Sequence, residues 1–166
     1  MPATYEKIAT TTLGSASASI TFNSISSAYT DLRLILTSNN TSNNQDGKLT
    51  FNNDTATNYS DTHLFGDGSS ATSYRETNQA YIALFSIANT GTSTFSFTQV
   101  DIFSYTGSTF KTVLSSVSND KNGSGVAART VGLWRSTSAI TRLDLALTAG
   151  NYNTGTTATL YGILKA

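Results

Sequence analysis

The sequence contains no cysteine, one proline, one histidine and one tryptophan in 166 residues. Without cysteine the chain has neither a disulfide framework nor a thiolate metal site, and its redox compartment stays open. The one proline, Pro2, lies at the N-terminus, so no predicted strand contains a residue that lacks a backbone donor. The chain therefore has few side chains suited to nucleophilic catalysis or to transition-metal binding.

Charge is equally scarce. Only 12% of the residues are charged, ten acidic and ten basic, and the formal net charge is zero. Lys and Arg are scattered singly, so no basic stripe is present to neutralise phosphates, and we expect no nucleic-acid partner. No apolar run approaches the roughly 18 residues of a membrane span, and residues 1–7 lack the basic and apolar regions of a signal peptide. We therefore expect no membrane partner, leader or anchor.

Hydroxyl and amide side chains are abundant, since Ser, Thr and Asn make up about 40% of the sequence. They stand in short alternating runs between turns rich in Gly, Asn and Asp, which is typical of β-structure. The hydrophobic fraction of 38% is low, but 10% aromatic residues and regularly spaced β-branched residues indicate an ordered core. The length suits one domain, residues 1–166, and a domain near this size buries roughly 70% of its surface on folding.

Strands are predicted wherever apolar residues recur at every second position. The pattern is clearest at residues 31–37 and 142–147, where leucines alternate with other residues. Further strand-like runs cover residues 5–13, 18–22, 48–51, 62–65, 81–87, 94–103, 110–117, 126–134 and 157–164. About eleven strands exceed what one flat sheet usually holds, so two packed sheets are expected. No helical segment and no internal repeat stand out. The predicted fold is an all-β, jelly-roll-like antiparallel β-sandwich.

The same alternation predicts which side chains form the core. The expected inward-facing set is Leu32, Leu34, Leu36, Phe95, Phe97, Leu133, Leu143, Leu145 and Leu147. In the run 94–103, however, Phe95 and Phe97 share one parity, whereas Val100 and Ile102 share the other. A slip of one residue reverses the face of all later side chains, so we predict a β-bulge or a sheet-to-sheet crossing at residues 98–99.

Glycine and asparagine mark the predicted connections. Glycine-containing turns are expected at residues 46–47, 66–68, 90–91, 123–125 and 150–151. The Gly-Ser-Gly sequence at 123–125 has no helix after it and no adjoining Lys, so it is predicted to be a turn rather than a phosphate cradle. The segment 38–45, SNNTSNNQ, has no apolar side chain to bury and is predicted to be a surface loop between two strands.

Few side chains are candidates for chemistry. His63 stands near Asp54 and Asp61, and an imidazole beside two carboxylates is able to bind a metal or to transfer a proton. No second histidine and no activated nucleophile accompany it, so we predict a structural or surface histidine. The Asp-containing turns, with residues 52–54 as the example, match the spacing of no calcium-binding loop. The sequence therefore predicts no catalytic, cofactor-binding or metal-binding residue, and no enzymatic activity.

The aromatic side chains fall into two sets. One set lies in alternating runs and is expected in the core: Phe22, Phe95, Phe97, Phe110 and Trp134. The other set stands beside Asn, Ser or Arg in turn-like segments: Tyr59, Tyr74, Tyr105 and Tyr152. That mixture of ring and polar neighbours suits stacking on a sugar ring. Ordinary strand-end tyrosines are the preferred interpretation, and glycan binding stays open as the alternative.

Three stretches together resemble a known class of proteins. They are residues 5–15 (YEKIATTTLGS), residues 49–60 with LTFNND and NYS, and residues 131–163 with VGLWRS and LYGI. With these motifs the chain resembles small virion structural proteins of tailed bacteriophages, especially phages of marine bacteria and cyanobacteria, from end to end. The resemblance implies a jelly-roll β-sandwich that acts as a capsid decoration (cement) protein or as a tail-fibre or receptor-binding module, without catalytic residues.

Of these roles the capsid decoration protein, which stabilises the head shell, is favoured. The first predicted strand begins within a few residues of Met1 and leaves no room for the shaft or coiled coil that a fibre tip needs. The resemblance also implies residence in the virion after assembly in the host bacterial cytoplasm. A neutral sandwich gains avidity from several copies, so we expect a closed homotrimer bound to the major capsid protein or another virion protein. The alternative is a tail-fibre module that recognises a host surface glycan.

Overall fold

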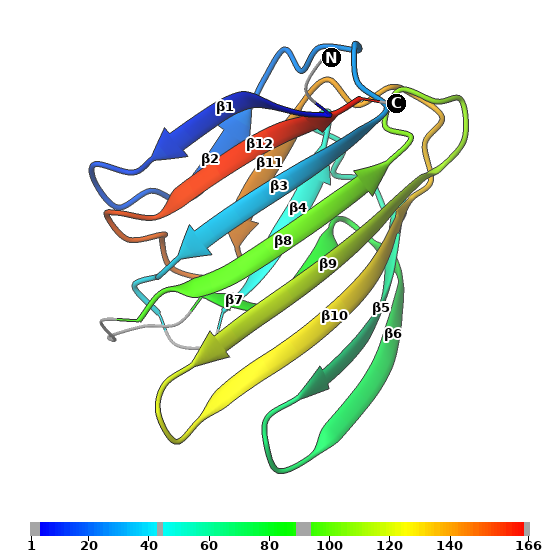
Figure 1. Cartoon of the computed structure of the whole chain (residues 1–166). Helices are drawn as coiled ribbons and strands as arrows, with labels where there is room; N and C mark the ends of the chain where they lie inside the picture. The colour runs from blue at the N-terminus through cyan, green and yellow to red at the C-terminus, as the bar shows by residue number, and fades with distance from the viewer. Residues whose placement is uncertain (1–3, 43–44, 89–93, 165–166) are drawn as a thin grey trace.

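The computed structural model describes residues 4–42, 45–88 and 94–164, and in these residues every regular element is a β-strand (Figure 1). The strands are β1 (Tyr5–Thr12), β2 (Ser19–Phe22), β3 (Asp31–Ser38), β4 (Gln45–Phe51), β5 (Tyr59–Gly66), β6 (Ala71–Gln79), β7 (Ile82–Ala88), β8 (Ser96–Phe103), β9 (Lys111–Asp120), β10 (Gly125–Trp134), β11 (Leu143–Leu147) and β12 (Thr157–Ile163). None of the described residues belongs to a helix long and apolar enough to cross a membrane.

The strands form two antiparallel sheets packed face to face. The large sheet has eight strands in the order β1-β12-β3-β8-β9-β10-β5-β6, and the small sheet has four in the order β2-β11-β4-β7. In Figure 1 the large sheet lies in front of the small one, and the strands nearest the two chain ends, β1 and β12, lie side by side. The predicted all-β, jelly-roll-like antiparallel sandwich is therefore confirmed.

The core lies between the two sheets and is built by alternation along the strands. The predicted core leucines of β3 and β11 are all buried: Leu32, Leu34, Leu36, Leu143, Leu145 and Leu147. Arg33 and Asp144, which stand between them, are half-buried on the outer faces of their sheets. Because each sheet has one apolar face, the sheets shield these residues from water only when they are stacked.

The two phenylalanines of the predicted core lie on the outer side instead. Phe95 is 45% exposed and Phe97 is 41% exposed. The strand β8 pairs with β3 and β9 in one continuous register within one sheet, so the predicted bulge or sheet-to-sheet crossing at residues 98–99 is wrong. Its inward positions begin with Ser96 and Thr98, both buried. Hydroxyl side chains therefore occupy core positions before Val100, and this produces the apparent change of phase in the sequence.

Leu133 is the third residue of the predicted core that faces outward. It is half-buried, whereas its neighbours Gly132 and Trp134 are buried on the inner face of β10. Gly132 allows β10 to approach the small sheet closely, since a Cβ at this position would lie 2.6 Å from Cγ2 of Ile82 on β7. Gly132 and Trp134, rather than Leu133, therefore lie on the inner face of β10.

The edge strand β6 has no counterpart among the predicted strands. Its sequence, ATSYRETNQ, lacks an apolar alternation and is largely exposed. It pairs with β5 along its length, from Ala71 opposite Gly66 to Gln79 opposite Tyr59. The register shifts between Tyr59 and Asp61. Backbone hydrogen bonds to a neighbouring strand form this element, because polar edge strands need no buried face.

The segment 38–45 matches the predicted surface loop only in part: Thr41 is exposed between β3 and β4, and residues 43–44 lie outside the described residues. Ser38 is the last residue of β3, and Ser38, Asn39 and Asn40 are all buried. The side-chain amide of Asn153 donates to Asn40 O at 2.8 Å and to Asn39 Oδ1 at 3.2 Å. These polar residues are buried because hydrogen bonds from a distant loop offset the loss of water.

Most of the predicted glycine turns lie in connections between strands. The turns at residues 66–68, 123–125 and 150–151 are confirmed. Residues 46–47 lie within β4 instead, where Gly47 packs directly against the side chain of Ile87. The turn predicted at 90–91 lies outside the described residues.

Candidate functional site

Large apolar side chains are exposed on the outer face of the large sheet. Leu64 on β5 is 56% exposed, and Val131 on β10, the neighbouring strand, is 52% exposed. Tyr5, Phe97 and Phe103 on β1 and β8 are between 41% and 43% exposed. We call this set of five side chains the outer apolar face. Large apolar side chains exposed along one face of a sheet otherwise rich in hydroxyls make that face a candidate interaction surface.

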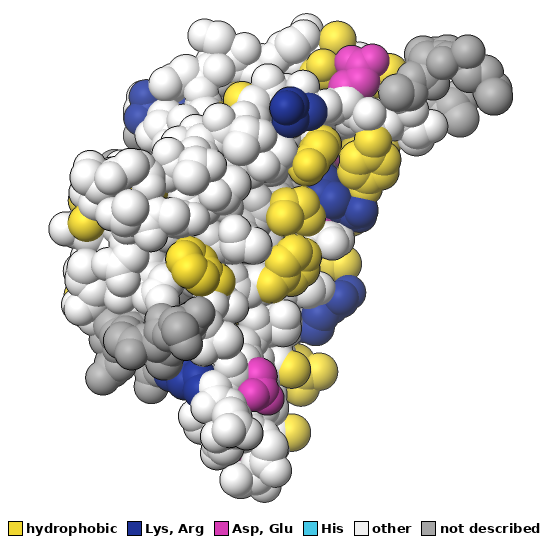
Figure 2. Space-filling model, turned by 60° about the vertical axis from the view of Figure 1, so that its left-hand side comes forward, with side chains coloured by type: hydrophobic (Ala, Val, Ile, Leu, Met, Phe, Trp, Pro, Cys, Tyr) yellow, Lys and Arg dark blue, Asp and Glu magenta, His cyan; other side chains and the backbone are white. Residues whose placement is uncertain are grey.

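Charged side chains alternate with these apolar ones. Arg33 Nε donates to Asp101 Oδ1 at 2.5 Å, and its guanidinium carbon lies 5.3 Å from the centre of the Tyr5 ring. Arg129 Nη1 donates to Ser116 Oγ at 2.7 Å. In Figure 2 the outer face of the large sheet comes to the right-hand side, where apolar and basic side chains follow one another. The face therefore combines apolar contact area with oriented hydrogen-bonding groups, as protein interfaces do.

An open hollow of about 440 Å³ lies in this face between the β5–β6 and β9–β10 hairpins. Leu64 and Ala127 line it, together with the small residues Gly66 and Ala71 and the stem of Arg129. The small side chains leave room beside the protruding Leu64. This part of the face is therefore shaped to receive an apolar side chain from a binding partner.

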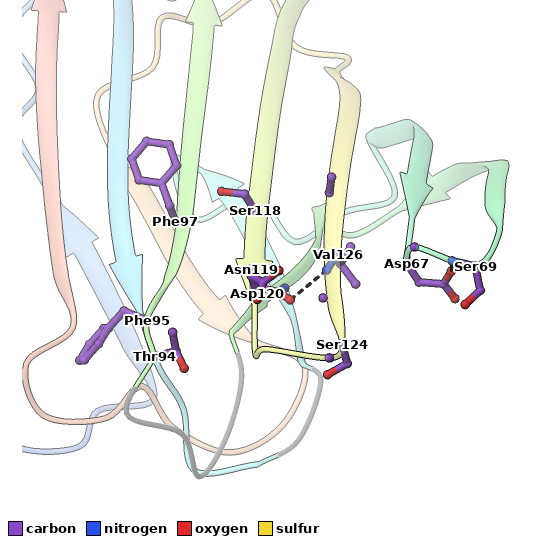
Figure 3. A pocket seen from close by; sticks show the side chains of 14 residues that line it. Asp67, Ser69, Thr94, Phe95, Phe97, Ser118, Asn119, Asp120, Ser124 and Val126 are labelled. Atoms are coloured by element: carbon purple, nitrogen blue, oxygen red, sulfur yellow. Dashed lines mark hydrogen bonds between the residues drawn. The ribbon is translucent and has the colours of Figure 1, made fainter.

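A larger groove of about 810 Å³ lies at one end of the same sheet. The β5–β6 connection, the start of β8 and the β9–β10 connection form it. Figure 3 shows Phe95 and Phe97 on one side of this groove and Asp67 and Ser69 on the opposite side, with Ser124 below. An aromatic wall opposite polar groups is the usual composition of a small-ligand site.

The polar groups of this groove are, however, largely engaged in holding its own turns. Asp67 Oδ1 accepts the backbone N–H groups of Ser69 and Ser70, each at 2.8 Å. Hydrogen bonds from Ser70 and Ser69 hold the pKa of Asp67 below its ordinary value. Asn119 Oδ1 accepts the N–H of Val126 at 3.1 Å, the bond drawn in Figure 3. Asp67 Oδ1 and Asn119 Oδ1 therefore hold the turns that form the groove, which leaves fewer polar atoms for a ligand.

Two of the motifs that carry the phage resemblance meet in one structural cluster. Asp54 Oδ2 accepts the indole N–H of Trp134 at 2.7 Å and the side-chain amide of Asn58 at 3.0 Å. The hydroxyl of Tyr59 donates to Asp54 O at 3.0 Å, and the Tyr59 and Trp134 rings stack 6.3 Å apart. Burial opposes ionisation of Asp54, but these hydrogen bonds and that from Ala56 lower its pKa. The two motifs therefore hold the connection between β4 and β5 in place. Asp54 belongs to this cluster and does not contact His63.

The structure does not bring the predicted sugar-stacking tyrosines together. Tyr59, Tyr105 and Tyr152 are fully buried, and their hydroxyls donate to backbone carbonyl oxygens. Tyr74 is 36% exposed, and its ring stacks on the imidazole ring of His63. Phe110, expected in the core, is 51% exposed. Two aromatic residues of the predicted core are confirmed as buried: Phe22 and Trp134.

His63 lies in a buried polar cluster. Its Nε2 atom is 2.9 Å from Asp61 Oδ1 and 4.0 Å from Glu76 Oε2. Its Nδ1 atom is 2.9 Å from Thr130 Oγ1, and Asp61 Oδ2 accepts the N–H of Ala83 at 2.8 Å. Within the described chain, Asp61, His63 and Glu76 are the three potential metal ligands found close together, with one ligand atom of each within 4.8 Å of the others. This arrangement is able to hold a cation or a proton.

Aromatic rings and further acidic groups surround this cluster. The Tyr74 ring stacks on the His63 ring with 4.6 Å between centroids, and the Phe85 ring lies 6.5 Å away. Burial, together with the negative charges of Asp46, Glu76 and Asp61, raises the pKa of Tyr74 to about 12. Burial also raises the pKa of Asp46. The cluster is therefore an acidic, largely enclosed environment.

The sequence identified part of this cluster. His63 and Asp61 stand two residues apart on a strand, so their side chains share a face, and this spacing is visible in the sequence. Glu76 lies on the unpredicted strand β6, and Thr130 lies on β10, so neither contact follows from the local pattern. Asp54, the other predicted neighbour of His63, belongs to the Trp134 cluster instead.

Comparison with known proteins identifies no family for the chain. No protein-family model matches the sequence, and no curated protein sequence matches it. Among solved structures, the fold is similar to the crystal structure of galectin LEC-6 from Caenorhabditis elegans, with a TM-score of 0.34 and 13% sequence identity over 94% of this chain and 96% of that one. This similarity is too weak to support a conclusion about function.

Proposed function

We propose that this protein is a non-enzymatic virion structural protein of the capsid decoration (cement) type, which stabilises the head shell of a bacteriophage. The observation that carries the proposal is the outer apolar face, where five large apolar side chains are exposed on one sheet. A surface of this kind is suited to rest on another protein. The resemblance of the sequence motifs to phage virion proteins supports a viral shell as that partner.

The charge distribution supports a protein partner rather than nucleic acid or membrane. The net charge is zero, and Arg33 and Arg142 are paired with Asp101 and Asp144 at 2.5 and 2.6 Å. A neutral surface provides little long-range attraction, so several copies acting together are needed for firm attachment. The proposal therefore includes a closed homotrimer on the major capsid protein or another virion protein, assembled in the host cytoplasm and retained in the virion.

The alternative function is a tail-fibre or receptor-binding module that recognises a host surface glycan. The groove of Figure 3 favours it, because Phe95 and Phe97 form an aromatic wall opposite polar residues. Two of its polar side chains, Asp67 and Asn119, hold turns, and three of the four tyrosines that suggested sugar stacking are buried. For these reasons we place this function second.

The decoration proposal is tested by placing charge on the outer apolar face. In the double variant Leu64→Asp and Val131→Asp, we expect binding to particles assembled without the protein to fall at least about tenfold, because two carboxylates would be desolvated at the interface. Co-sedimentation with such particles measures binding and copy number. The matched control is Ser19→Asp, an exposed position on the outer face of the small sheet, which is expected to bind as the unchanged protein does.

Particles that lack the protein distinguish the two functions. A cement protein is expected to leave them sensitive to heat and osmotic shock, whereas host adsorption stays normal. Particles that keep full resistance but no longer adsorb to cells would contradict the cement role. In that case Phe95→Ala is expected to abolish binding to a host-glycan array, which would support the receptor-binding function.

A further inference from the structure

We propose that Asp61, His63 and Glu76 form a binding site for a divalent transition-metal ion of the zinc type. The inference is independent of the decoration role, since the site lies beneath β6, on the inner side of the large sheet, and not on the outer apolar face. Imidazole nitrogen and carboxylate oxygen are both ligands that zinc accepts. The two carboxylates and a neutral imidazole carry a charge of −2, which a divalent cation neutralises.

The ligand atoms are already close to coordinating positions. His63 Nε2 and Asp61 Oδ1 are 2.9 Å apart, and His63 Nε2 and Glu76 Oε2 are 4.0 Å apart. Ligands at about 2.1 Å from a tetrahedral zinc ion are separated by about 3.4 Å. The two separations that include His63 therefore differ from this value by about half an ångström, and one ligand atom of each of the three residues already lies within 4.8 Å of the others. The Glu76 side chain is 41% exposed and so is free to move, whereas those of His63 and Asp61 are fully buried.

The surrounding residues orient the ligands as the outer shell of a metal site does. Thr130 Oγ1 lies 2.9 Å from His63 Nδ1. In the tautomer with the N–H on Nδ1, this group donates to the hydroxyl, and the Nε2 lone pair is directed at the two carboxylates. The N–H of Ala83 holds Asp61 Oδ2 and leaves Oδ1 for the metal. The Tyr74 ring stacked on the imidazole restricts its rotation.

A proton is the competing occupant of the same position. A doubly protonated His63 would donate from Nε2 to Asp61 and from Nδ1 to Thr130, and it would satisfy the same distances. Among the described residues, His63 is the one basic side chain within ion-pair distance of Asp61 or Glu76. The exposed Glu76 distinguishes the two occupants: a metal needs it as a ligand, whereas a proton shared between His63 and Asp61 does not.

The experiment is calorimetric titration of the full chain with Zn²⁺ after removal of metals by a chelator. We expect the unchanged protein to bind one Zn²⁺ per chain with a dissociation constant in the micromolar range or tighter. Glu76→Gln should lower this affinity about tenfold or more. Thr130→Val, which removes the group that orients His63, should lower it about 10- to 100-fold. Asp120→Asn, at the exposed end of β9, is the matched control and should leave affinity unchanged. Substitution with Co²⁺ should give the visible absorption of a four-coordinate site in the unchanged protein and not in Glu76→Gln.

Two results would overturn the proposal. One is the absence of Zn²⁺ binding to the unchanged protein. The other is binding that Glu76→Gln leaves unaltered, which would place the metal elsewhere. Because Glu76 lies on an exposed edge strand, its substitution should not unfold the chain, and thermal unfolding recorded in parallel verifies this for each variant.

Discussion

Leu145 shows at the scale of one residue how the core of this protein is sealed. Its side chain is fully buried in the middle of β11, and its register partners are Ile20 on β2 and Leu49 on β4. Leu145→Ala removes buried methyl groups and leaves a cavity, so we predict a loss of about 2–5 kcal/mol in the free energy of unfolding. Urea denaturation measures it. Val131→Ala on the outer apolar face is the control, with an expected loss of about 1 kcal/mol or less. A similarly small loss at Leu145 would contradict a sealed core.

At the scale of elements, Gly132 controls how closely β10 approaches β7. A Cβ at this position would lie 2.6 Å from Cγ2 and 2.8 Å from Cδ1 of Ile82, which is too short for a relaxed contact. Gly132→Ala should therefore force the sheets apart locally and cost about 1–3 kcal/mol of stability. The double variant with Ile82→Val, which shortens the opposing side chain, should recover part of that loss in the same denaturation assay. Additive losses in the two variants would contradict the contact.

The contacts of Asp144 where β2 pairs with β11 should make the free energy of unfolding depend on pH. Arg142 donates twice to the Asp144 carboxylate at 2.6 Å, and Thr21 donates to it at 2.6 Å. Burial opposes ionisation of Asp144, but these hydrogen bonds outweigh it and lower its pKa below the ordinary 3.8. A carboxyl group whose pKa is lower in the folded state stabilises the fold when the pH is above its pKa in the unfolded state. This contribution is lost as the pH falls through its pKa in the folded state.

We therefore predict that Asp144→Asn is less stable than the unchanged protein near neutral pH, and that the difference narrows below about pH 4. Denaturation at pH 7, 4 and 3 measures this difference. A constant difference across that range would show that the Asp144 charge contributes nothing to folding. Asp120→Asn, at the exposed end of β9, provides the comparison for a general effect of lost charge.

At the scale of the whole molecule, the neutral chain and its exposed sheet lead to a prediction about assembly. The strands β1 and β6 are the edges of the large sheet, and uncovered edges expose backbone groups that pair with other strands. A closed homotrimer would cover such edges and provide the avidity that the zero net charge does not. Native mass spectrometry at micromolar concentration should show a trimer, whereas a clean monomer would restrict trimer formation to the viral shell.

The sequence by itself determined the strands with an apolar alternation, though not the polar strand β6, and that two sheets must stack. Side-chain direction alternates along a strand, so the leucines of residues 31–37 and 142–147 reveal their buried face without knowledge of any partner. The same local rule places His63 and Asp61 on one face. It was misleading at Phe95 and Phe97, because the inward residues beside them are hydroxyl-bearing and the phenylalanines face outward.

Only the tertiary structure decided the contacts between strands that are distant in the sequence. The polar strand β6 forms because β5 offers it hydrogen bonds, and its Glu76 reaches His63 for the same reason. Asn39 and Asn40 are buried because Asn153 supplies their hydrogen bonds from across the chain. The physical reason is common to all these cases: alternation is a property of a single strand, whereas pairing and the satisfaction of buried polar groups depend on partners that the local sequence does not contain.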